Sequence, residues 1–207
     1  MDKLIAGCEL AGIDPVICIS KADLAGQEAV EQALSVYSPL YPAVSVNCMT
    51  GEGIEILRET IRGNKVALAG PSGVGKSTIT NLLHAGEPGI EEAEEALLKA
   101  ATGRISKKTG RGRHTTRHVE IFPLSDGTML YDTPGFTSLD MPGMEPRAVR
   151  DLFPEFRSRN GMCRYSDCMH INEPDCAVKE ALQQGLISVS RYESYKSMTE
   201  EVKKWQK

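Results

Sequence analysis

The chain has 207 residues, of which 41% are hydrophobic, and its formal net charge is −4. This length accommodates one nucleotide-binding domain with a small appendage, and the composition is ordinary for a soluble globular protein. No segment approaches the roughly 18 apolar residues that cross a bilayer, and Met1 is not followed by a basic flank and a long apolar stretch. These features argue against a membrane-bound or secreted protein, so we expect a cytoplasmic location and no membrane partner.

Charge is unevenly distributed along the chain. An acidic run at 91–95 is followed by a basic stretch from Arg104 to His118, which contains six Lys or Arg residues, two His and no acid. This stretch has the composition of a segment that binds phosphate or RNA, and a solvated loop is the alternative. Of the six cysteines, three crowd around His170 and three stand alone, which is typical of a reducing compartment with one metal site.

Apolar runs alternate with helical patterns over the first 85 residues. The runs predict strands at 15–19, 41–46 and 65–69, and the periodic segments predict helices at 3–11, 27–37, 53–62 and 77–84. Alternation of this kind predicts an α/β fold with a parallel-rich, doubly wound sheet.

A hairpin and a helical region follow the charged stretches. Residues 119–122 and 129–131 predict two antiparallel strands joined at Ser125-Asp126-Gly127. Proline and glycine become frequent after Met141, so we place a boundary there: residues 1–143 form a nucleotide-binding domain and residues 144–207 a small α-helical, zinc-binding one.

A phosphate-binding loop stands between a predicted strand and a predicted helix. Gly70-Pro71-Ser72-Gly73-Val74-Gly75-Lys76-Ser77 fits the pattern G-x-x-x-x-G-K-[ST]. The glycines let successive N–H groups face the phosphates, Lys76 would bridge the β- and γ-phosphates, and the Ser77 hydroxyl would hold Mg²⁺. Thr78, next along the helix, completes this segment of nucleotide-binding residues.

The second hairpin strand ends in Asp132-Thr133-Pro134-Gly135, which fits D-x-x-G. Asp132 can reach Mg²⁺ through a water molecule, and the Gly135 N–H can meet the γ-phosphate. The same tetrapeptide is also a good turn, but its place after a phosphate loop and a hairpin favours the binding role.

Ser20-Lys21-Ala22-Asp23, after the first apolar strand, resembles the N-K-x-D motif that selects guanine. A carboxylate at Asp23 accepts hydrogen bonds from guanine N1–H and N2–H₂, which adenine cannot donate. Lys21 would lie over the base. Ser20 replaces the usual Asn, and a helix N-cap at Asp23 is the alternative reading.

One strand later, Ser45-Val46-Asn47 stands where GTPases carry S-A-K, whose backbone contacts the guanine oxygen. These base-reading motifs precede the phosphate loop, whereas in ordinary GTPases they follow it. The fold tolerates this permutation because all the binding loops lie at one edge of the sheet.

Four candidate metal ligands cluster in the second domain. Cys163, Cys168, His170 and Cys176 supply three thiolates and one imidazole, the ligand set of a closed tetrahedral zinc site. Reduced cysteines without a metal are the alternative, although a small unit with few large apolar residues needs a bound metal to stabilise its fold.

The chain closely resembles the ribosome small-subunit-dependent GTPase A family. The resemblance rests on the permuted motif order, the phosphate loop, the cysteine cluster, and the segments Gly112-Arg113-His114-Thr115-Thr116-Arg117 and Asp132-Thr133-Pro134-Gly135-Phe136. The resemblance spans nearly the whole chain. It implies a circularly permuted GTPase that uses GTP/GDP, Mg²⁺ and one structural Zn²⁺, and that acts late in maturation of the small (30S) ribosomal subunit.

The resemblance also assigns residues for hydrolysis. The basic stretch becomes switch I, in which Thr116, or alternatively Thr115, closes on Mg²⁺. Phe136 occupies the position of the water-orienting glutamine of many GTPases, and a phenyl ring cannot hold water. His114 is then the nearest polar candidate for that role, with a phosphate or rRNA contact as its alternative. Weak intrinsic hydrolysis that a partner stimulates by ordering switch I follows from this arrangement.

The chain departs from the family in two ways. Family members carry an N-terminal OB-fold domain that has no counterpart before Met1, and the strand that normally lies between residues 65–69 and 15–19 has no counterpart either. We therefore expect either that the two flanking strands pair directly or that a segment outside these 207 residues fills the gap.

The resemblance predicts the small ribosomal subunit and its rRNA as partners, with no DNA partner and a monomeric chain. Two other functions fit parts of the sequence: a P-loop ATPase or kinase, which Asp23 disfavours, and a non-catalytic RNA-binding zinc module that only holds nucleotide.

Overall fold

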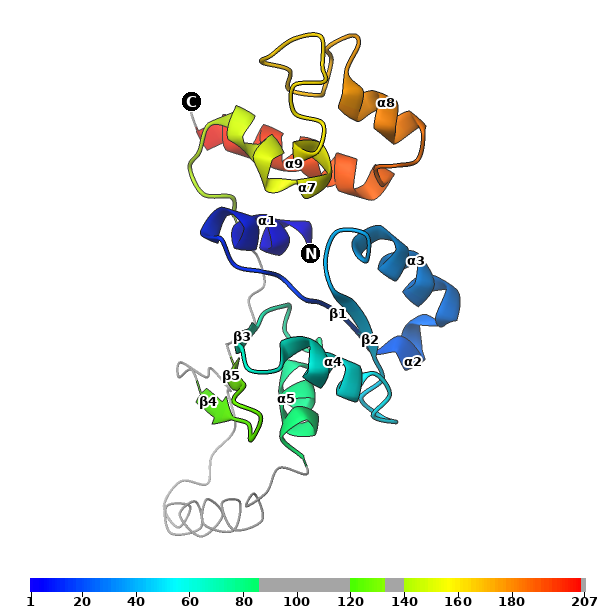
Figure 1. Cartoon of the computed structure of the whole chain (residues 1–207), viewed down its shortest axis with the longest axis vertical. Coiled ribbons are helices and arrows are strands. Elements are labelled where there is room, and N and C mark those ends of the chain that lie inside the picture. The colour runs from blue at the N-terminus through cyan, green and yellow to red at the C-terminus, as the bar shows by residue number, and fades with distance from the viewer. Residues whose placement is uncertain (86–119, 133–139, 206–207) are drawn as a thin grey trace. The chain divides into compact units, whose positions relative to one another are not determined.

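Residues 1–85, 120–132 and 140–205 are described by a computed structural model, shown in Figure 1. The helices are α1 (Asp2–Ala11), α2 (Ala22–Ala25), α3 (Gln27–Tyr37), α4 (Ile54–Ile61), α5 (Lys76–His84), the 3-10 helix η1 (Pro146–Leu152), α7 (Pro154–Arg157), α8 (Ala177–Gln183) and α9 (Val189–Trp205). The strands are β1 (Ile17–Ser20), β2 (Ala43–Val46), β3 (Lys65–Leu68), β4 (Glu120–Pro123) and β5 (Met129–Asp132). The expected α/β fold with a helical C-terminal region is confirmed.

One sheet has three strands in the order β3-β5-β4. Strand β5 runs parallel to β3 and antiparallel to β4, which confirms the predicted hairpin. The hairpin turn is closed by Asp126, whose Oδ1 accepts a 2.9 Å hydrogen bond from the Thr128 N–H, and by Gly127 with φ 87°. A glycine is needed at that left-handed position because a Cβ is disfavoured there.

Strands β1 and β2 form a separate two-stranded sheet. We expected that, without the strand that normally lies between them, β1 and β3 could pair directly. Among the described residues β1 and β3 lie in different sheets, so this pairing is not found. Nor do the described strands form a six-stranded sheet. The other outcome, a segment outside residues 1–207, stays a prediction.

The helices form where the apolar spacing predicts them. In α4 the buried residues Ile54, Leu57 and Ile61 recur every three or four positions, which places them on one face of the helix. Helix α1 ends at Gly12, whose left-handed conformation lets its N–H bond back to the last turn. The short helix α2 is not among the helices that the apolar spacing predicts.

The chain folds into two compact units. The first contains residues 1–19 and 27–43 and the described part of 138–207, and the second contains residues 20–26 and the described part of 44–137. Both ends of the chain thus belong to the first unit. The boundary that we placed at residue 143 divides the sequence into two consecutive domains, whereas these two units alternate along the chain. The boundary therefore stays a prediction.

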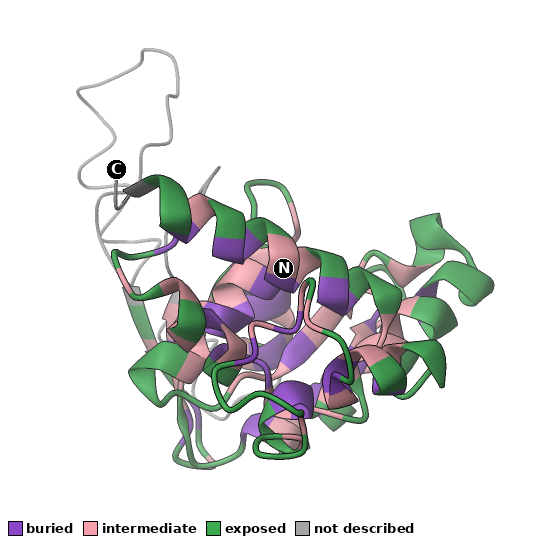
Figure 2. Cartoon of the chain, turned by 90° about the horizontal axis from the view of Figure 1, so that it is seen from above, coloured by how far each residue is buried: buried purple, intermediate pink, exposed green. Residues whose placement is uncertain are grey.

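The first unit has a continuous apolar core, to which α1, η1, α7, α8 and α9 all contribute. Its aromatic centre includes Phe153, Phe156 and Tyr195, of which Phe156 and Tyr195 meet edge to face with 4.9 Å between ring centroids. In Figure 2 the helices carry exposed residues along one side and buried residues along the other, as expected for amphipathic helices around a core.

A buried arginine lies beside this core. Arg191 of α9 is 1% exposed and donates hydrogen bonds of 2.8 Å both to Asp2 of α1 and to Glu155 of α7. Its guanidinium also lies 4.6 Å from the centroid of the Phe153 ring. Residues 189 positions apart along the chain are therefore joined by one charged cluster.

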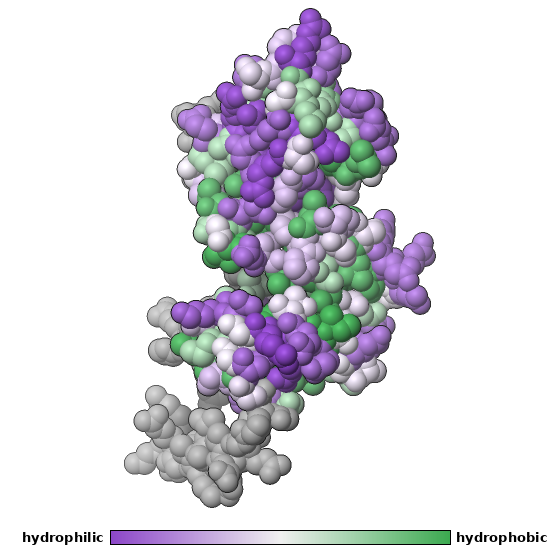
Figure 3. All heavy atoms as spheres, viewed as in Figure 1, coloured by the Kyte–Doolittle hydropathy of each residue, from purple (hydrophilic) through white to green (hydrophobic). Residues whose placement is uncertain are grey.

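Hydrophilic residues cover much of the face drawn in Figure 3, with hydrophobic residues scattered among them. Within the described ranges, none of the helices combines the length and the apolar character required to span a membrane.

Candidate nucleotide site and metal centre

The loop of residues 70–77 leads from β3 into α5, the strand-to-helix context that a phosphate-binding loop requires. Gly73 and Gly75 have φ angles of 76° and 102°, which favour glycine strongly. Gly75 is the N-cap of the nine-residue helix α5, and the N–H groups of the first turn of a helix have no partner within the helix, which suits them to bind an anion.

The Lys76 ammonium folds back onto this loop. It donates hydrogen bonds of 2.9 Å to the Gly70 carbonyl and 3.0 Å to the Pro71 carbonyl. These bonds hold a positive charge against the loop backbone, where it can bind phosphate oxygens.

The backbone register places Asp132 next to this loop. Asp132 ends β5 and pairs with Leu68, the last residue of β3, two positions before Gly70. The start of the D-x-x-G motif therefore lies beside the start of the phosphate loop, as a shared Mg²⁺ site requires. Gly135 lies outside the described residues.

A side-chain hydrogen bond joins the base-reading segment to the phosphate loop. The Ser20 hydroxyl, at the end of β1, donates a 2.7 Å hydrogen bond to the carbonyl of Val74, 54 positions away. Lys21 follows with φ 57°, an uncommon conformation for a residue with a Cβ. Asp23 lies in the first turn of α2. The segment therefore turns sharply immediately after its contact with the phosphate loop.

The turn after β2 lies beside Asp23. Partial burial raises the pKa of the Cys48 thiol, and the negative charge of the nearby Asp23 carboxylate raises it further. The turn itself is shaped by Asn47, whose Oδ1 accepts hydrogen bonds from the N–H groups of Met49 and Thr50 at 2.9 and 3.3 Å.

Gly53 closes this turn against the strand. Its φ is 83°, and a Cβ built on it would stand 2.0 Å from the Ser45 carbonyl oxygen, so no other residue fits. Ser45 and Val46 lie inside β2, and Val46 is fully buried. The turn that follows β2 therefore begins at Asn47.

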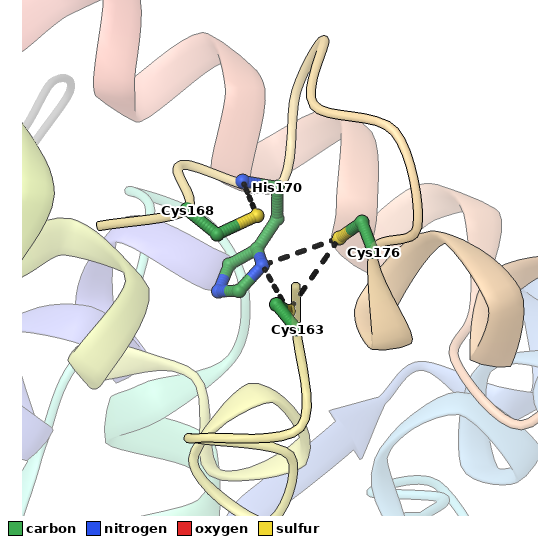
Figure 4. A group of neighbouring side chains, drawn as sticks. All are labelled: Cys163, Cys168, His170 and Cys176. Atoms are coloured by element: carbon green, nitrogen blue, oxygen red, sulfur yellow. Dashed lines mark hydrogen bonds between the residues drawn. The ribbon is translucent and has the colours of Figure 1, made fainter. Parts of the chain in front are cut away.

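The four predicted metal ligands converge, and Figure 4 shows their side chains pointing toward one another. One ligand atom from each of Cys163, Cys168, His170 and Cys176 lies within 4.8 Å of the others. The His170 Nδ1 is 3.5 Å from the Cys163 Sγ and 3.3 Å from the Cys176 Sγ, and these two sulfurs are 3.9 Å apart. Around a tetrahedral Zn²⁺ with bonds of about 2.0–2.3 Å, ligand atoms stand about 3.5–3.8 Å apart, so the donor set fits this ion.

The electrostatics of the cluster also suit a cation. Burial raises the pKa of the Cys168 thiol to about 12 and raises that of Cys176, and burial lowers the pKa of His170. A neutral imidazole is the form that binds metal, and a bound cation stabilises thiolates that burial alone disfavours. With Nδ1 as ligand, the ring proton sits on Nε2, which is buried and has no hydrogen-bond partner among the described residues.

The arrangement was compared with known proteins. The sequence model of the RsgA GTPase family matches residues 1–142. The chain belongs to this family.

Relatives within the RsgA family match the chain along its whole length. It is 43% identical over 208 residues to a protein of Caldanaerobacter subterraneus subsp. tengcongensis and 42% identical to one of Agathobacter rectalis, each named small ribosomal subunit biogenesis GTPase RsgA. The alignments cover 100% of this chain but only 66% and 65% of those relatives.

Two solved structures are similar to this chain in fold. YjeQ from Thermotoga maritima aligns over 97% of this chain and 64% of its own, with a TM-score of 0.75 and 33% identity. YloQ, described as a circularly permuted GTPase, aligns over 98% and 62%, with a TM-score of 0.71 and 27% identity. The permuted arrangement inferred from the order of motifs is therefore confirmed.

Several of the residues predicted for this RsgA-family site are brought together by the structure. The phosphate loop, Ser20 and the backbone of Asp132 meet in the second unit, and the four metal ligands meet in the first. The predicted switch residues His114, Thr115 and Thr116 lie outside the described residues, as does Phe136.

Sequence reasoning missed two parts of the site. It noted that Ser20 replaces the usual Asn but did not foresee its bond to Val74. It also passed over Glu173, a carboxylate inside the metal-ligand loop (residues 163–176) that accepts three backbone hydrogen bonds.

Proposed function

We propose that the chain binds GTP, hydrolyses it to GDP and phosphate, and acts in late maturation of the small ribosomal subunit. The observation that carries the proposal is the hydrogen bond from Ser20 to Val74, because it joins a base-reading segment to a phosphate loop in the permuted order of the RsgA family. The names of the relatives described above supply the ribosomal role.

In this proposal the phosphates bind to the segment of residues 70–78, through the backbone N–H groups of its residues other than Pro71. Lys76 neutralises the β- and γ-phosphates from its place against the loop. Mg²⁺, when bound, neutralises negative charge on the phosphate oxygens. The Ser77 hydroxyl, Thr116 and, through a water molecule, Asp132 would hold it.

The base binds to the segment Ser20–Asp23. Asp23 accepts the guanine N–H groups, and Lys21 covers the base with its alkyl chain. The backbone of Ser45, Val46 and Asn47, at the end of β2 and the start of the following turn, contacts the guanine oxygen.

Hydrolysis forms a bond between a water oxygen and the γ-phosphorus, breaks the bond from that phosphorus to the bridging oxygen, and releases GDP and phosphate. His114 is our candidate for orienting the water, because Phe136 cannot do so. A partner that orders the segment around His114 would accelerate the reaction, and the small ribosomal subunit is the partner that we propose.

One structural Zn²⁺ held by the four-residue cluster stabilises the C-terminal region. Three thiolates and one imidazole leave no coordination position open in a tetrahedral site, so this ion serves structure rather than chemistry. The family model ends at residue 142, which supports a division of the chain near 143.

We further propose a monomer that works in the cytoplasm and contacts rRNA, without a DNA or membrane partner. These properties follow from the assignment to ribosome maturation and share its test.

Competition binding and turnover test the proposal. GDP and GTP should displace a fluorescent guanine nucleotide while ATP does not, and purified small subunits should raise GTP turnover. Equal displacement by ATP would identify a P-loop ATPase. Guanine binding with no turnover, with or without subunits, would identify a non-catalytic module that only holds nucleotide.

A further inference from the structure

Two of the metal ligands, Cys168 and His170, are separated by a single residue. To direct both toward one point the backbone must turn abruptly, and His170 accordingly has φ 58°. A left-handed conformation is unfavourable for a residue with a Cβ unless its surroundings hold it. The turn at 168–172 therefore needs partners that fix it.

Glu173 provides partners for the N–H groups of this turn. Its Oε1 accepts a 2.8 Å hydrogen bond from the Met169 N–H, and its Oε2 accepts bonds of 2.9 and 3.0 Å from the N–H groups of Ile171 and Asn172. One carboxylate thus binds the backbone on both sides of His170. Charge-assisted bonds of this kind are stronger than bonds between neutral groups.

The carbonyl groups of the same turn are held from other elements. Arg150 of η1 donates a 2.7 Å bond to the Cys168 carbonyl, and Tyr192 of α9 donates a 2.6 Å bond to the His170 carbonyl. Tyr195 donates to the carbonyl of Met169 between them. Helices hold the carbonyl side of the turn, and Glu173 holds its N–H side.

Glu173 is not itself a ligand. The ligand atoms that converge come from three cysteines and one histidine, which already complete a tetrahedral set. Its two carboxylate oxygens are committed to backbone N–H groups. Any influence on the metal must therefore pass through the shape of the turn.

We propose that Glu173 is the positioning residue of the metal site, holding the turn so that Cys168 and His170 stand in ligand geometry before a metal binds. This inference rests on the proposed zinc site. Its consequence is that Glu173 sets metal affinity, because without it part of the binding free energy is spent on ordering the turn.

The test compares zinc affinity between Glu173→Gln and Asp175→Asn in the full chain, by competition with a chromophoric zinc chelator. Asp175→Asn is a matched control: it removes the same charge from the same loop, its carboxylate pairs with the exposed Arg164, and Asn accepts the φ of 52° found there. We expect Glu173→Gln to bind zinc at least about tenfold more weakly than the unsubstituted chain, and the control to stay within about twofold.

Cobalt substitution gives a second readout. The visible absorption bands of Co²⁺ report ligand geometry, and we expect Glu173→Gln to shift or broaden them while Asp175→Asn leaves them unchanged. A Glu173→Asp variant keeps the charge on a shorter side chain. It should give an intermediate affinity if Glu173→Gln folds too poorly to measure.

Different outcomes overturn different proposals. If the unsubstituted chain binds no stoichiometric zinc, the zinc site fails and this inference fails with it. If it binds zinc and the Glu173 variants keep its affinity and cobalt spectrum, only the positioning role is refuted. An equal loss in Glu173→Gln and Asp175→Asn refutes it too, because loop charge rather than the turn would then set the affinity.

Discussion

The phosphate loop and the metal-ligand loop are both short continuous segments, but they are held in different ways. The phosphate loop gains its shape from glycine conformations and from Lys76 bonding to carbonyls of its own loop, with Ser20 reaching it from elsewhere. The metal-ligand loop is held by side chains from η1 and α9 and lies against an aromatic core.

This difference indicates which property each loop controls. A glycine loop that binds through its backbone depends on its ligand for much of its order, so changes there should alter binding and leave stability almost unchanged. The metal-ligand loop is part of a packed unit that includes α1, so changes there should alter stability first.

The largest effect is expected from Lys76→Ala. Because this substitution removes the ammonium that lies against the phosphate loop, GTP hydrolysis should fall at least about 1,000-fold. Steady-state phosphate release with small subunits present measures it. Thermal unfolding should be unchanged, and Lys65→Ala on the exposed side of β3 serves as the control. Turnover close to that of the control would remove the phosphate loop from the mechanism.

Arg191→Met should give the largest loss of stability. The substitution leaves the buried carboxylates of Asp2 and Glu155 without their cation, which costs about 3–5 kcal/mol of unfolding free energy. Denaturant unfolding followed by fluorescence is suited to this measurement, because the one tryptophan of the chain is Trp205 in α9.

The control for Arg191 is Arg62→Met. Arg62 pairs with Glu59 at 2.8 Å, but its side chain is 56% exposed, whereas that of Arg191 is 1% exposed. An exposed pair contributes at most about 1 kcal/mol. Equal losses in the two variants would mean that the buried cluster does not stabilise the first unit.

Asp23→Ala should change base selection by a smaller amount. Losing the hydrogen bonds that a carboxylate accepts from guanine should reduce the preference for GDP over ADP by about 100-fold, since such bonds are worth about 1.5–3 kcal/mol. Competition binding with both nucleotides measures this ratio. If the preference persists in Asp23→Ala, the turn that begins at Asn47 would be the main selector of the base.

Much of the second unit could be predicted because its signals are local. The phosphate loop, the hairpin of β4 and β5 and its turn at Asp126 each depend on neighbouring residues. The structure confirms the hairpin and its turn, and it confirms that residues 70–77 lead from a strand into a helix. The strand predicted at 41–46 ends where β2 ends, at Val46. The guanine contact assigned to residues 45–47 stays a prediction, because the end of a strand fixes a position and not what binds there.

The first unit was less predictable because its contacts are remote in sequence. Nothing near Arg191 indicates that its partner is Asp2, and nothing near Tyr41 indicates its 3.0 Å bond to Glu9 of α1. The ligand set of the metal site could be read from spacing. The role of Glu173 could not, because a glutamate in a loop ordinarily faces solvent.

The smallest effect, and the most direct test of the contrast, is expected from Ser20→Ala. The hydroxyl makes one hydrogen bond across 54 positions, to the Val74 carbonyl, and such a bond contributes about 0.5–1.5 kcal/mol. Affinity for GDP should therefore fall about three- to tenfold, while the unfolding curve followed at Trp205 should not move, because that residue lies in the other unit.

Ser20→Asn restores the residue common in this motif, and its amide can donate to the same carbonyl, so it should bind GDP as well as the unsubstituted chain does. Ser38→Ala, at an exposed serine beyond α3, controls for the loss of a hydroxyl. If Ser20→Ala bound GDP as tightly as Ser38→Ala, the bond between the two loops would not contribute to nucleotide binding, and each loop would have to take its shape from the nucleotide alone.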